Sequence, residues 1–259
     1  MDLFELMQNQ TGFFLLVFTR ITGIFSMAPI FGSRNVSVTV KAGLALALTF
    51  ILFPLVFNET TTIPDGFIGY LFLVASEFLI GLIIGFAASL VFSAIQMAGQ
   101  LLDMQIGFGI VNVLDPQSGQ QLPLVGNFKY ILALLVFLAT NSHHMLLAAL
   151  FSSFKLIPVT GFIYHSEITE VMVNMVGGMF IIAIKICFPV LLSLLLMDVA
   201  LGILARTMPQ MNIFIVGVPG KIIVGLFVLS MALPFYIMFL EVAFSGMYKD
   251  IYRLLSRMG

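Results

Sequence analysis

Six hydrophobic stretches separated by shorter polar segments dominate the chain. They cover residues 11–31, 38–57, 67–96, 128–151, 171–197 and 213–244. A helix needs roughly 20 mostly apolar residues to cross a bilayer. The pattern therefore predicts an all-α integral membrane protein with about six long apolar helices.

The junction between the last two stretches is unusually polar. Residues 171–197 are apolar apart from Lys185, and residues 222–240 carry no charge. Two helices joined in this way form an antiparallel hairpin, and Pro209 and Pro219 interrupt the connection because proline has no backbone N–H. Ionisable groups at the ends of apolar segments are costly in lipid. The junction is therefore a functional or assembly site, or alternatively an interfacial loop whose charged side chains reach water. Its charged residues are Asp198, Arg206 and Lys221.

Two charged residues interrupt the earlier stretches. Arg20 lies near the centre of the first, where an isolated charge would cost on the order of 3 kcal/mol in lipid, so it is expected to face protein. Glu77 lies one turn before a stripe of small residues spaced four apart, which share one helix face and allow another backbone to approach closely. We expect Glu77 to be buried by whatever packs there. The stripe consists of Gly81, Gly85, Ser89 and Ser93.

Residues 98–123 mix apolar side chains with Gln, Asp, Asn and Gly. Asp103 and Asp115 bracket the sequence Gly107-Phe108-Gly109. Non-helical backbone at membrane depth is tolerated only where it is buried in protein or lines a cavity. A re-entrant or pore-lining loop is the preferred interpretation, and a long surface loop is the alternative.

Three further features bear on the helices. Residues 141–144 (NSHH) indicate a helix break or polar packing site inside the fourth stretch, since adjacent histidines point about 100° apart on a helix and do not easily share one metal. Residues 155–170 form a polar linker that predicts a domain boundary. Pro189 predicts a kink, because it removes the hydrogen bond to the Lys185 carbonyl.

Composition supports the membrane assignment. Hydrophobic residues make up 61% of the 259, charged residues 9%, and the mean hydropathy is +1.15. A net charge of −1 argues against nucleic-acid binding through a basic surface. The single cysteine, Cys187, excludes a disulfide framework. The sequence contains no HExxH or GxSxG motif, so we expect no enzyme activity, no metal site and no cofactor.

Loop charges conflict with a simple topology. Basic residues in the first and fifth loops place those loops in the cytoplasm and put both termini of a six-span chain outside. The basic C-terminal segment argues that its own end is inside. The conflict suggests that some segments do not span lipid conventionally. The C-terminal charges are Lys249, Arg253 and Arg257.

Residues 205–225, ARTMPQMNIFIVGVPGKIIVG, resemble the signature of the FliR/SctT family of type III secretion export-gate proteins. The similarity extends to the opening stretch, the third stretch, the central loop and the polar break. The matching residues outside the signature are Arg20, Ala28, Pro29, Arg34, Lys41, Glu77, Gly81, Gly85, Ala98, Gly99, Asp103, Gln105, Ile106, Gly107, Phe108, Leu114, Asp115, Pro116, Asn141, His144, Asp198, Leu201 and Gly202.

The resemblance implies a fold in two parts. Residues 1–165 would be a FliP-like helical part that includes the central loop, and residues 166–259 a FliQ-like kinked helical hairpin with an amphipathic C-terminus. The central loop would plug a closed pore. The implied plug residues are Ile106, Gly107, Phe108, Gly109, Ile110 and Val111.

The resemblance also implies a function without catalysis. The chain would be a subunit of the flagellar export gate, forming and gating the channel for unfolded flagellar proteins across the inner membrane, in the flagellar basal body. Its implied partners are FliP and FliQ homologues, FlhB and FlhA. The expected buried charges, each needing a partner outside its own helix, are Arg20, Glu77, Lys185, Asp198, Arg206 and Lys221.

An ion channel or secondary transporter with a re-entrant loop is the alternative function. The GFG sequence at residues 107–109 weakly resembles a potassium filter. Such a filter also needs four symmetric copies and a preceding Thr-Val. Selective single-ion conductance by the isolated protein would favour this class.

Overall fold

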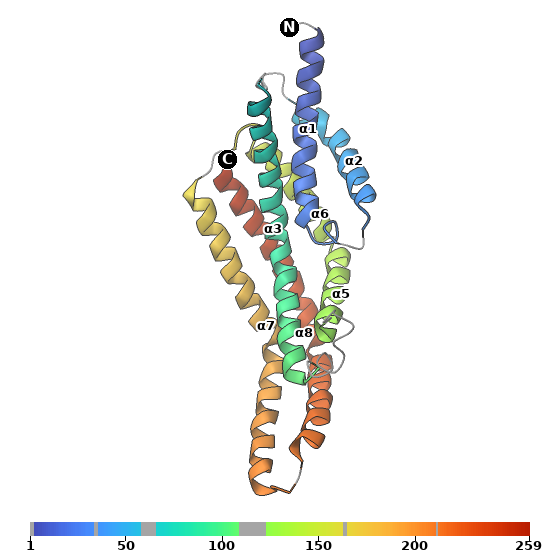
Figure 1. Ribbon diagram of the computed structural model, residues 1–259, viewed down its shortest axis with the longest axis vertical. Helices are drawn as coiled ribbons and strands as arrows, with labels where there is room; N and C mark the ends of the chain where they lie inside the picture. Colours follow the sequence, from blue (N-terminus) through green and yellow to red (C-terminus); the bar gives the residue numbers. More distant parts are fainter. Residues whose placement is uncertain (1–2, 34–35, 58–65, 109–122, 163–164, 211) are drawn as a thin grey trace. The chain divides into compact units, whose positions relative to one another are not determined.

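The computed structural model describes residues 3–33, 36–57, 66–108, 123–162, 165–210 and 212–259, which contain seven α-helices and no strand. This confirms the all-α prediction (Figure 1). By length and composition, five of the helices can cross a membrane, and α5 with α6 would form a sixth, broken span. The helices are α1 (Leu3–Met27), α2 (Val38–Val56), α3 (Phe67–Ile106), α5 (Leu124–Ala139), α6 (Ser142–Leu156), α7 (Ser166–Thr207) and α8 (Ile213–Met258).

The third helix is longer than its apolar stretch. We expected a loop over residues 98–123, but α3 continues to Ile106, so the loop prediction is wrong for residues 98–106. The helix continues because the polar side chains near its end have partners. The Asp103 carboxylate accepts a hydrogen bond from the Val125 N–H, and the Gln105 amide donates one to Asp198. Residues 109–122 lie outside the described part of the chain. The amphipathic C-terminal segment is the continuation of α8 rather than a separate element.

The fourth apolar stretch is broken where its polar residues predicted a break. Helix α5 ends at Ala139 and α6 begins at Ser142. Between them, Asn141 has φ 55, in the left-handed region that asparagine tolerates better than most residues. The rings of His143 and His144 lie 4.1 Å apart just after the break.

The chain forms two compact packing units. Unit 1 comprises Met1–Leu90, Asn141–Val176 and Ser245–Gly259, and unit 2 comprises Val91–Thr140 and Gly177–Phe244. Helices α3, α7 and α8 therefore contribute to both. This division by packing does not test the proposed FliP-like and FliQ-like parts, which rest on resemblance and stay a prediction.

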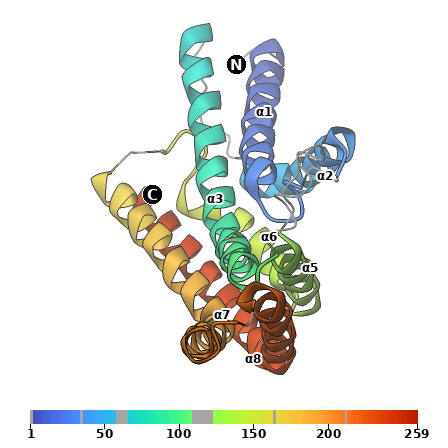
Figure 2. The same cartoon turned by 60° about the horizontal axis from the view of Figure 1, so that its bottom comes forward.

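In unit 1, α1 lies between α2 and the first half of α3 (Figure 2). Phenylalanine rings join α1 to α2, with the Phe13 and Phe57 centroids 5.3 Å apart. Against α3 the backbones themselves meet: a Cβ added to Gly85 would lie 2.7 Å from the Ile24 carbonyl oxygen, and one on Gly81 would overlap the Arg20 carbonyl. Small residues are therefore required at this crossing.

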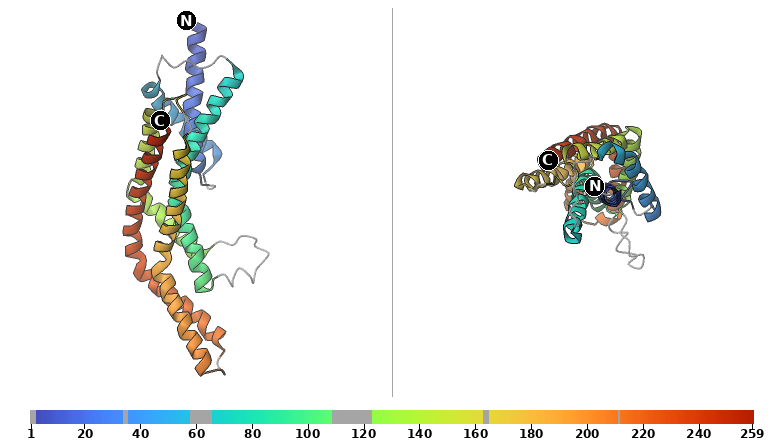
Figure 3. Two further views of the ribbon diagram at one scale, coloured as in Figure 1. Left: turned by 90° about the vertical axis from the view of Figure 1, so that its left-hand side faces the viewer. Right: turned by 90° about the horizontal axis from the view of Figure 1, so that it is seen from above.

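In unit 2, α7 and α8 run side by side toward their shared turn (Figure 3). The end of α3 crosses α5 so closely that a Cβ on Gly99 would overlap the backbone of Gly126. Aromatic rings fill the other end of this unit, with Phe92 and Phe137 each within 5.5 Å of the Phe244 ring centroid. These contacts position the charged groups described next.

Candidate functional site

A buried ion pair lies in the interior of unit 1. Arg20 and Glu77 are both fully buried. The Arg20 Nε donates to Glu77 Oε2 at 2.5 Å, and Nη2 donates to Oε1 at 3.0 Å. Two parallel bonds of this kind make the strong, geometrically specific form of an arginine–carboxylate pair. The prediction that Arg20 faces protein is confirmed.

Backbone groups complete this pair. The Arg20 Nη1 donates to the carbonyl oxygens of Ser153 (3.1 Å) and Ile157 (2.9 Å). The backbone N–H of Thr160 donates to Glu77 Oε1 at 3.3 Å. The pair therefore ties α1 and α3 to the end of α6 and to the connection that follows it. Its role in assembly with other subunits stays a prediction.

The charges of the predicted hairpin junction form a second network, in unit 2. The Asp198 carboxylate of α7 pairs with the Lys221 ammonium of α8, and both side chains are partly exposed. Gln105, near the end of α3, donates to Asp198 Oδ2 at 2.7 Å. Asp198 thus links three helices.

Of the six expected buried charges only Arg20 and Glu77 are buried in this chain, while Asp198 and Lys221 are partly exposed. Lys185 and Arg206 are exposed, because α7 turns these positions away from its neighbours. Within the described residues neither forms an ion pair. Their description as buried charges is therefore wrong for the single chain, and any role in assembly stays a prediction.

Asp103 fixes both ends of the segment that contains the predicted plug. Its backbone carbonyl accepts hydrogen bonds from the N–H groups of Gly107 (3.3 Å) and Phe108 (3.0 Å), which close the last turn of α3. Its carboxylate accepts from the N–H groups of Val125 (3.0 Å) and Gly126 (3.1 Å) at the start of α5. A carboxylate there satisfies free N–H groups and complements the positive end of the helix dipole.

The first residues of the predicted plug rest on α8. Ile106 is fully buried, and its Cγ1 lies 2.9 Å from where a Cβ on Gly225 would be. Gly107 has φ 104, a conformation that favours glycine, and it faces Val218. Phe108 is half-buried. The other expected plug residues, Gly109, Ile110 and Val111, lie outside the described residues.

The residues of the small-residue stripe do not all contact the same helix. Gly81 and Gly85 lie against α1, as described above. Ser89 and Ser93 are half-buried further along α3, where the Ser89 hydroxyl donates to the Phe86 carbonyl at 2.7 Å. Only the glycines of the stripe lie at the α1–α3 crossing.

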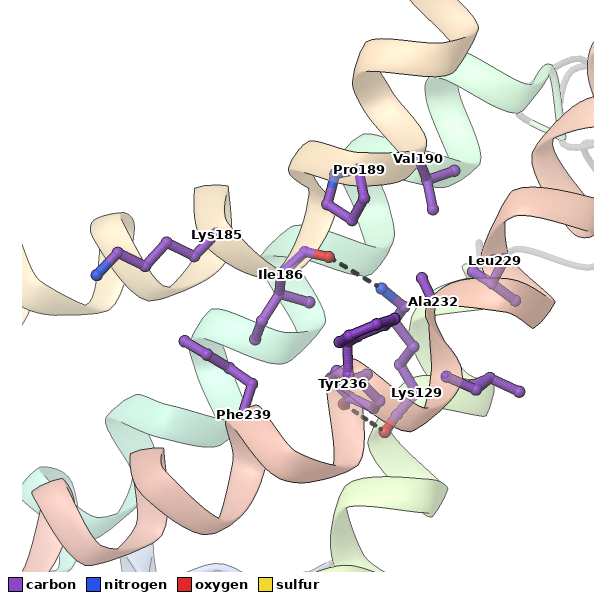
Figure 4. Close-up of a pocket in the computed structure, with 11 residues that line it drawn as sticks. Lys129, Lys185, Ile186, Pro189, Val190, Leu229, Ala232, Tyr236 and Phe239 are labelled. Carbon is purple, nitrogen blue, oxygen red and sulfur yellow. Dashed lines mark hydrogen bonds between the residues drawn. The ribbon is translucent and has the colours of Figure 1, made fainter.

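Sequence reasoning missed a buried cation in unit 2. Lys129 of α5 is only 3% exposed. Its ammonium donates to the Ile186 carbonyl of α7 at 3.4 Å, and its backbone carbonyl accepts from the Tyr236 hydroxyl of α8 at 3.0 Å (Figure 4). The signal was a lone lysine at the second position of the stretch 128–151, where a side chain that reaches water is the ordinary interpretation.

Comparison with known proteins gives a consistent result along the chain. Residues 11–247 match the family described as "Bacterial export proteins, family 1". The flagellar biosynthetic protein FliR of Bacillus subtilis (strain 168) is 39% identical over 249 residues, covering 95% of each chain. This chain belongs to the FliR family. FliR of Pectobacterium carotovorum is 31% identical over 97% of this chain and 96% of that protein, and FliR of Escherichia coli (strain K12) is 29% identical over 92% and 91%.

Membership of the FliR family confirms the resemblance drawn from the signature and supports a role in flagellar biosynthesis and bacterial export. FliR is a flagellar export family rather than an enzyme family. With five helices able to span a bilayer, the FliR-family chain is a membrane protein. The family favours export over the ion-channel alternative.

Proposed function

We propose that the chain is a subunit of the flagellar type III export gate, where it helps to form and gate the channel for unfolded flagellar proteins across the inner membrane. The observation that carries the proposal is the double use of Asp103. One residue caps the helix that leads into residues 109–122 and the helix that follows them. The two described ends of this segment are thereby held together by one residue.

A loop of this composition suits a stopper in a channel. A pore wide enough for an unfolded polypeptide would leak ions if nothing blocked it. Glycines allow tight bends, and apolar bulk at a constriction can exclude water. The apolar plug residues are Ile106, Phe108, Ile110 and Val111.

The hairpin network gives the loop a second connection. Gln105 precedes the loop directly and is bonded to Asp198, which pairs with Lys221. A movement of the α7–α8 hairpin would therefore be transmitted to the base of the loop. We propose that partner subunits act on the loop through this contact.

The proposed partners are FliP and FliQ homologues, with FlhB and FlhA nearby, in the basal body of the inner membrane. Residues 1–165 would take the place of a FliP-like subunit, and residues 166–259 that of a FliQ-like hairpin. The charges of the hairpin, and exposed Lys185 and Arg206, would meet neighbouring subunits. The proposal for these partners rests on the family resemblance.

The test is deletion of residues 107–111 in cells that assemble flagella. We expect the gate to assemble and to leak sodium ions or protons, with export of flagellar proteins altered. A deletion of equal length in the polar segment at residues 58–65 is the control and should not leak. If the assembled gate stays ion-tight without residues 107–111, the plug proposal fails; if the gate does not assemble, the residues serve packing instead.

A further inference from the structure

Lys129 lines a cavity of about 310 Å³ in unit 2. The cavity lies between α5, α7 and α8 (Figure 4), and most of the groups around it are apolar or aromatic, such as Leu229, Leu233 and Phe239. An ammonium group at the edge of an apolar cavity is uncommon, because burying a charge is costly unless it is paired.

The Lys129 ammonium is under-satisfied by the described part of the chain. Its contacts there are a long hydrogen bond, 3.4 Å, to the Ile186 carbonyl and the face of the Tyr236 ring, 5.0 Å away. An ammonium carries three N–H donors. Among the described residues no carboxylate forms an ion pair with it. The described residues therefore supply no carboxylate to this ammonium.

Two prolines account for the space. Pro189 in α7 lines the cavity, and Pro234 in α8 stands between the lining residues Leu233 and Phe235. Proline has no N–H and breaks the regular hydrogen-bond ladder. In Figure 4 the ribbon of α7 changes direction between Lys185 and Val190, as the sequence predicted for Pro189. The cavity lies beside this bend, and the Ile186 carbonyl, one residue beyond the Lys185 carbonyl that Pro189 leaves unbonded, accepts from the Lys129 ammonium.

The level of the cavity along the hairpin suits a lipid headgroup. From the cavity to the shared turn, residues 186–207 and 213–235 measure roughly 33–35 Å at 1.5 Å per residue. The hydrocarbon core of a bilayer is about 30 Å thick. Of the three charges within these arms, Asp198 and Lys221 pair with each other, and Arg206 lies one residue before the end of α7, next to the turn. If the arms cross the core, the cavity lies at its boundary, where lipid phosphates are.

The rim of the cavity combines a cation with exposed apolar rings. Lys185 contributes its aliphatic stem, and its ammonium points away from Lys129 (Figure 4). Phe235, which lines the cavity, is 74% exposed, and Phe239, also part of the lining, is half-buried. A ligand that matches these features carries both a negative charge and hydrocarbon chains. Basic pockets between membrane helices take such lipids.

We propose that this cavity binds an anionic phospholipid, with the phosphate on the Lys129 ammonium and the acyl chains across Phe235 and Phe239. The protein, purified with its co-expressed partners, is placed in nanodiscs of phosphatidylcholine and phosphatidylglycerol in equal amounts, then extracted, and its retained lipids are quantified by mass spectrometry. We expect phosphatidylglycerol to be enriched. Lys129→Gln should lower that enrichment roughly fivefold or more.

A matched control is available in unit 1. Lys155 is exposed, and its ammonium lies 4.6 Å from the Phe151 ring centroid, so it shares the aromatic contact without the cavity. Lys155→Gln should leave lipid retention unchanged. Two further variants separate lipid binding from folding: Lys129→Arg should keep the enrichment, and Ala232→Phe should abolish it by filling the cavity with Lys129 still present.

Several outcomes would overturn the proposal. Unchanged enrichment in Lys129→Gln or in Ala232→Phe would show that the lipid binds elsewhere. Displacement of the lipid by inorganic phosphate would assign the site to a free anion. Loss of a co-purifying partner from Lys129→Gln, with lipid content unchanged, would assign the anion to a carboxylate of that partner. If the Lys129→Gln protein does not accumulate, the other two variants test the proposal: the lipid enrichment should be kept in Lys129→Arg and lost in Ala232→Phe.

Discussion

At the scale of single residues, Arg20 shows how a cation is accommodated among apolar helices. Four of its N–H···O contacts reach oxygen atoms of Glu77, Ser153 and Ile157. The Phe154 ring lies 4.3 Å from its Cζ atom. A buried pair of this kind adds little net stability compared with apolar residues of the same volume, but loss of one partner leaves an uncompensated charge.

Glu77→Gln should therefore destabilise the chain by about 3–5 kcal/mol. The amide cannot neutralise Arg20, and it offers one acceptor where the carboxylate offers two. Thermal unfolding in a single detergent, followed by intrinsic tyrosine fluorescence, measures the effect.

The control for this prediction is Glu167→Gln. Glu167 pairs with Arg257 in the same unit, but the two side chains are 57% and 55% exposed. Exposed pairs contribute about 0–1 kcal/mol. Equal losses from Glu77→Gln and Glu167→Gln would contradict the view that burial makes the Arg20–Glu77 pair critical.

At the scale of helices, the α1–α3 crossing depends on the absence of side chains. Gly23 and Gly81 meet so closely that a Cβ on Gly23 would lie 2.6 Å from the Phe78 carbonyl and 3.1 Å from the Gly81 Cα. The obstructing atoms belong to backbone, so they cannot yield by a side-chain rotation. The same crossing carries Arg20 and Glu77 on its two helices.

We expect Gly81→Ala to cost about 1–3 kcal/mol, because the added methyl group forces the helices apart. Gly43→Ala in α2 is the matched control: nothing lies within 4 Å of its Cβ position, and alanine favours a helix over glycine by about 1 kcal/mol. Unfolding midpoints of the two variants should move in opposite directions. A stabilised Gly81→Ala protein would show that the crossing is less tight than described.

The helices also show which features a single sequence can predict. The hydrophobic stretches predicted the positions of the described helices, and the NSHH sequence predicted the break before α6. The end of α3 was misplaced, since Asp103 and Gln105 look like loop residues until their partners in α5 and α7 are known. For the same reason, the sequence indicates that Arg20 needs a partner, but it does not identify Glu77, 57 residues away, as that partner.

At the scale of the whole molecule, the outer faces of α7 and α8 are largely apolar. Phe180, Ile184 and Phe227 are each at least 46% exposed. Glu241, further along α8, is exposed as well and forms no ion pair within the described residues. Such a surface needs lipid or other subunits, and a charge on it favours subunits.

Co-expression with FliP and FliQ homologues should therefore raise the yield of monodisperse protein in detergent. The reason is the exposed surface, because four of the six charges expected to need partners are paired inside the chain: Arg20 with Glu77, and Asp198 with Lys221. Size-exclusion chromatography of the chain with and without its partners makes the measurement. A stable, monodisperse monomer in isolation would count against the prediction.

The division of the chain into two packing units bears on its biosynthesis. Unit 1 contains Met1–Leu90, but also Asn141–Val176 and Ser245–Gly259. Arg20 and Glu77 leave the ribosome long before the carbonyl groups of Ser153 and Ile157 that complete their site. The early helices must therefore wait, inserted but incompletely packed, until the last turns of α8 have been translated. Unit 2 is fully translated at Phe244, whereas unit 1 also needs Ser245–Gly259. A chain stalled between these points would expose the unfinished interior of unit 1 to membrane proteases.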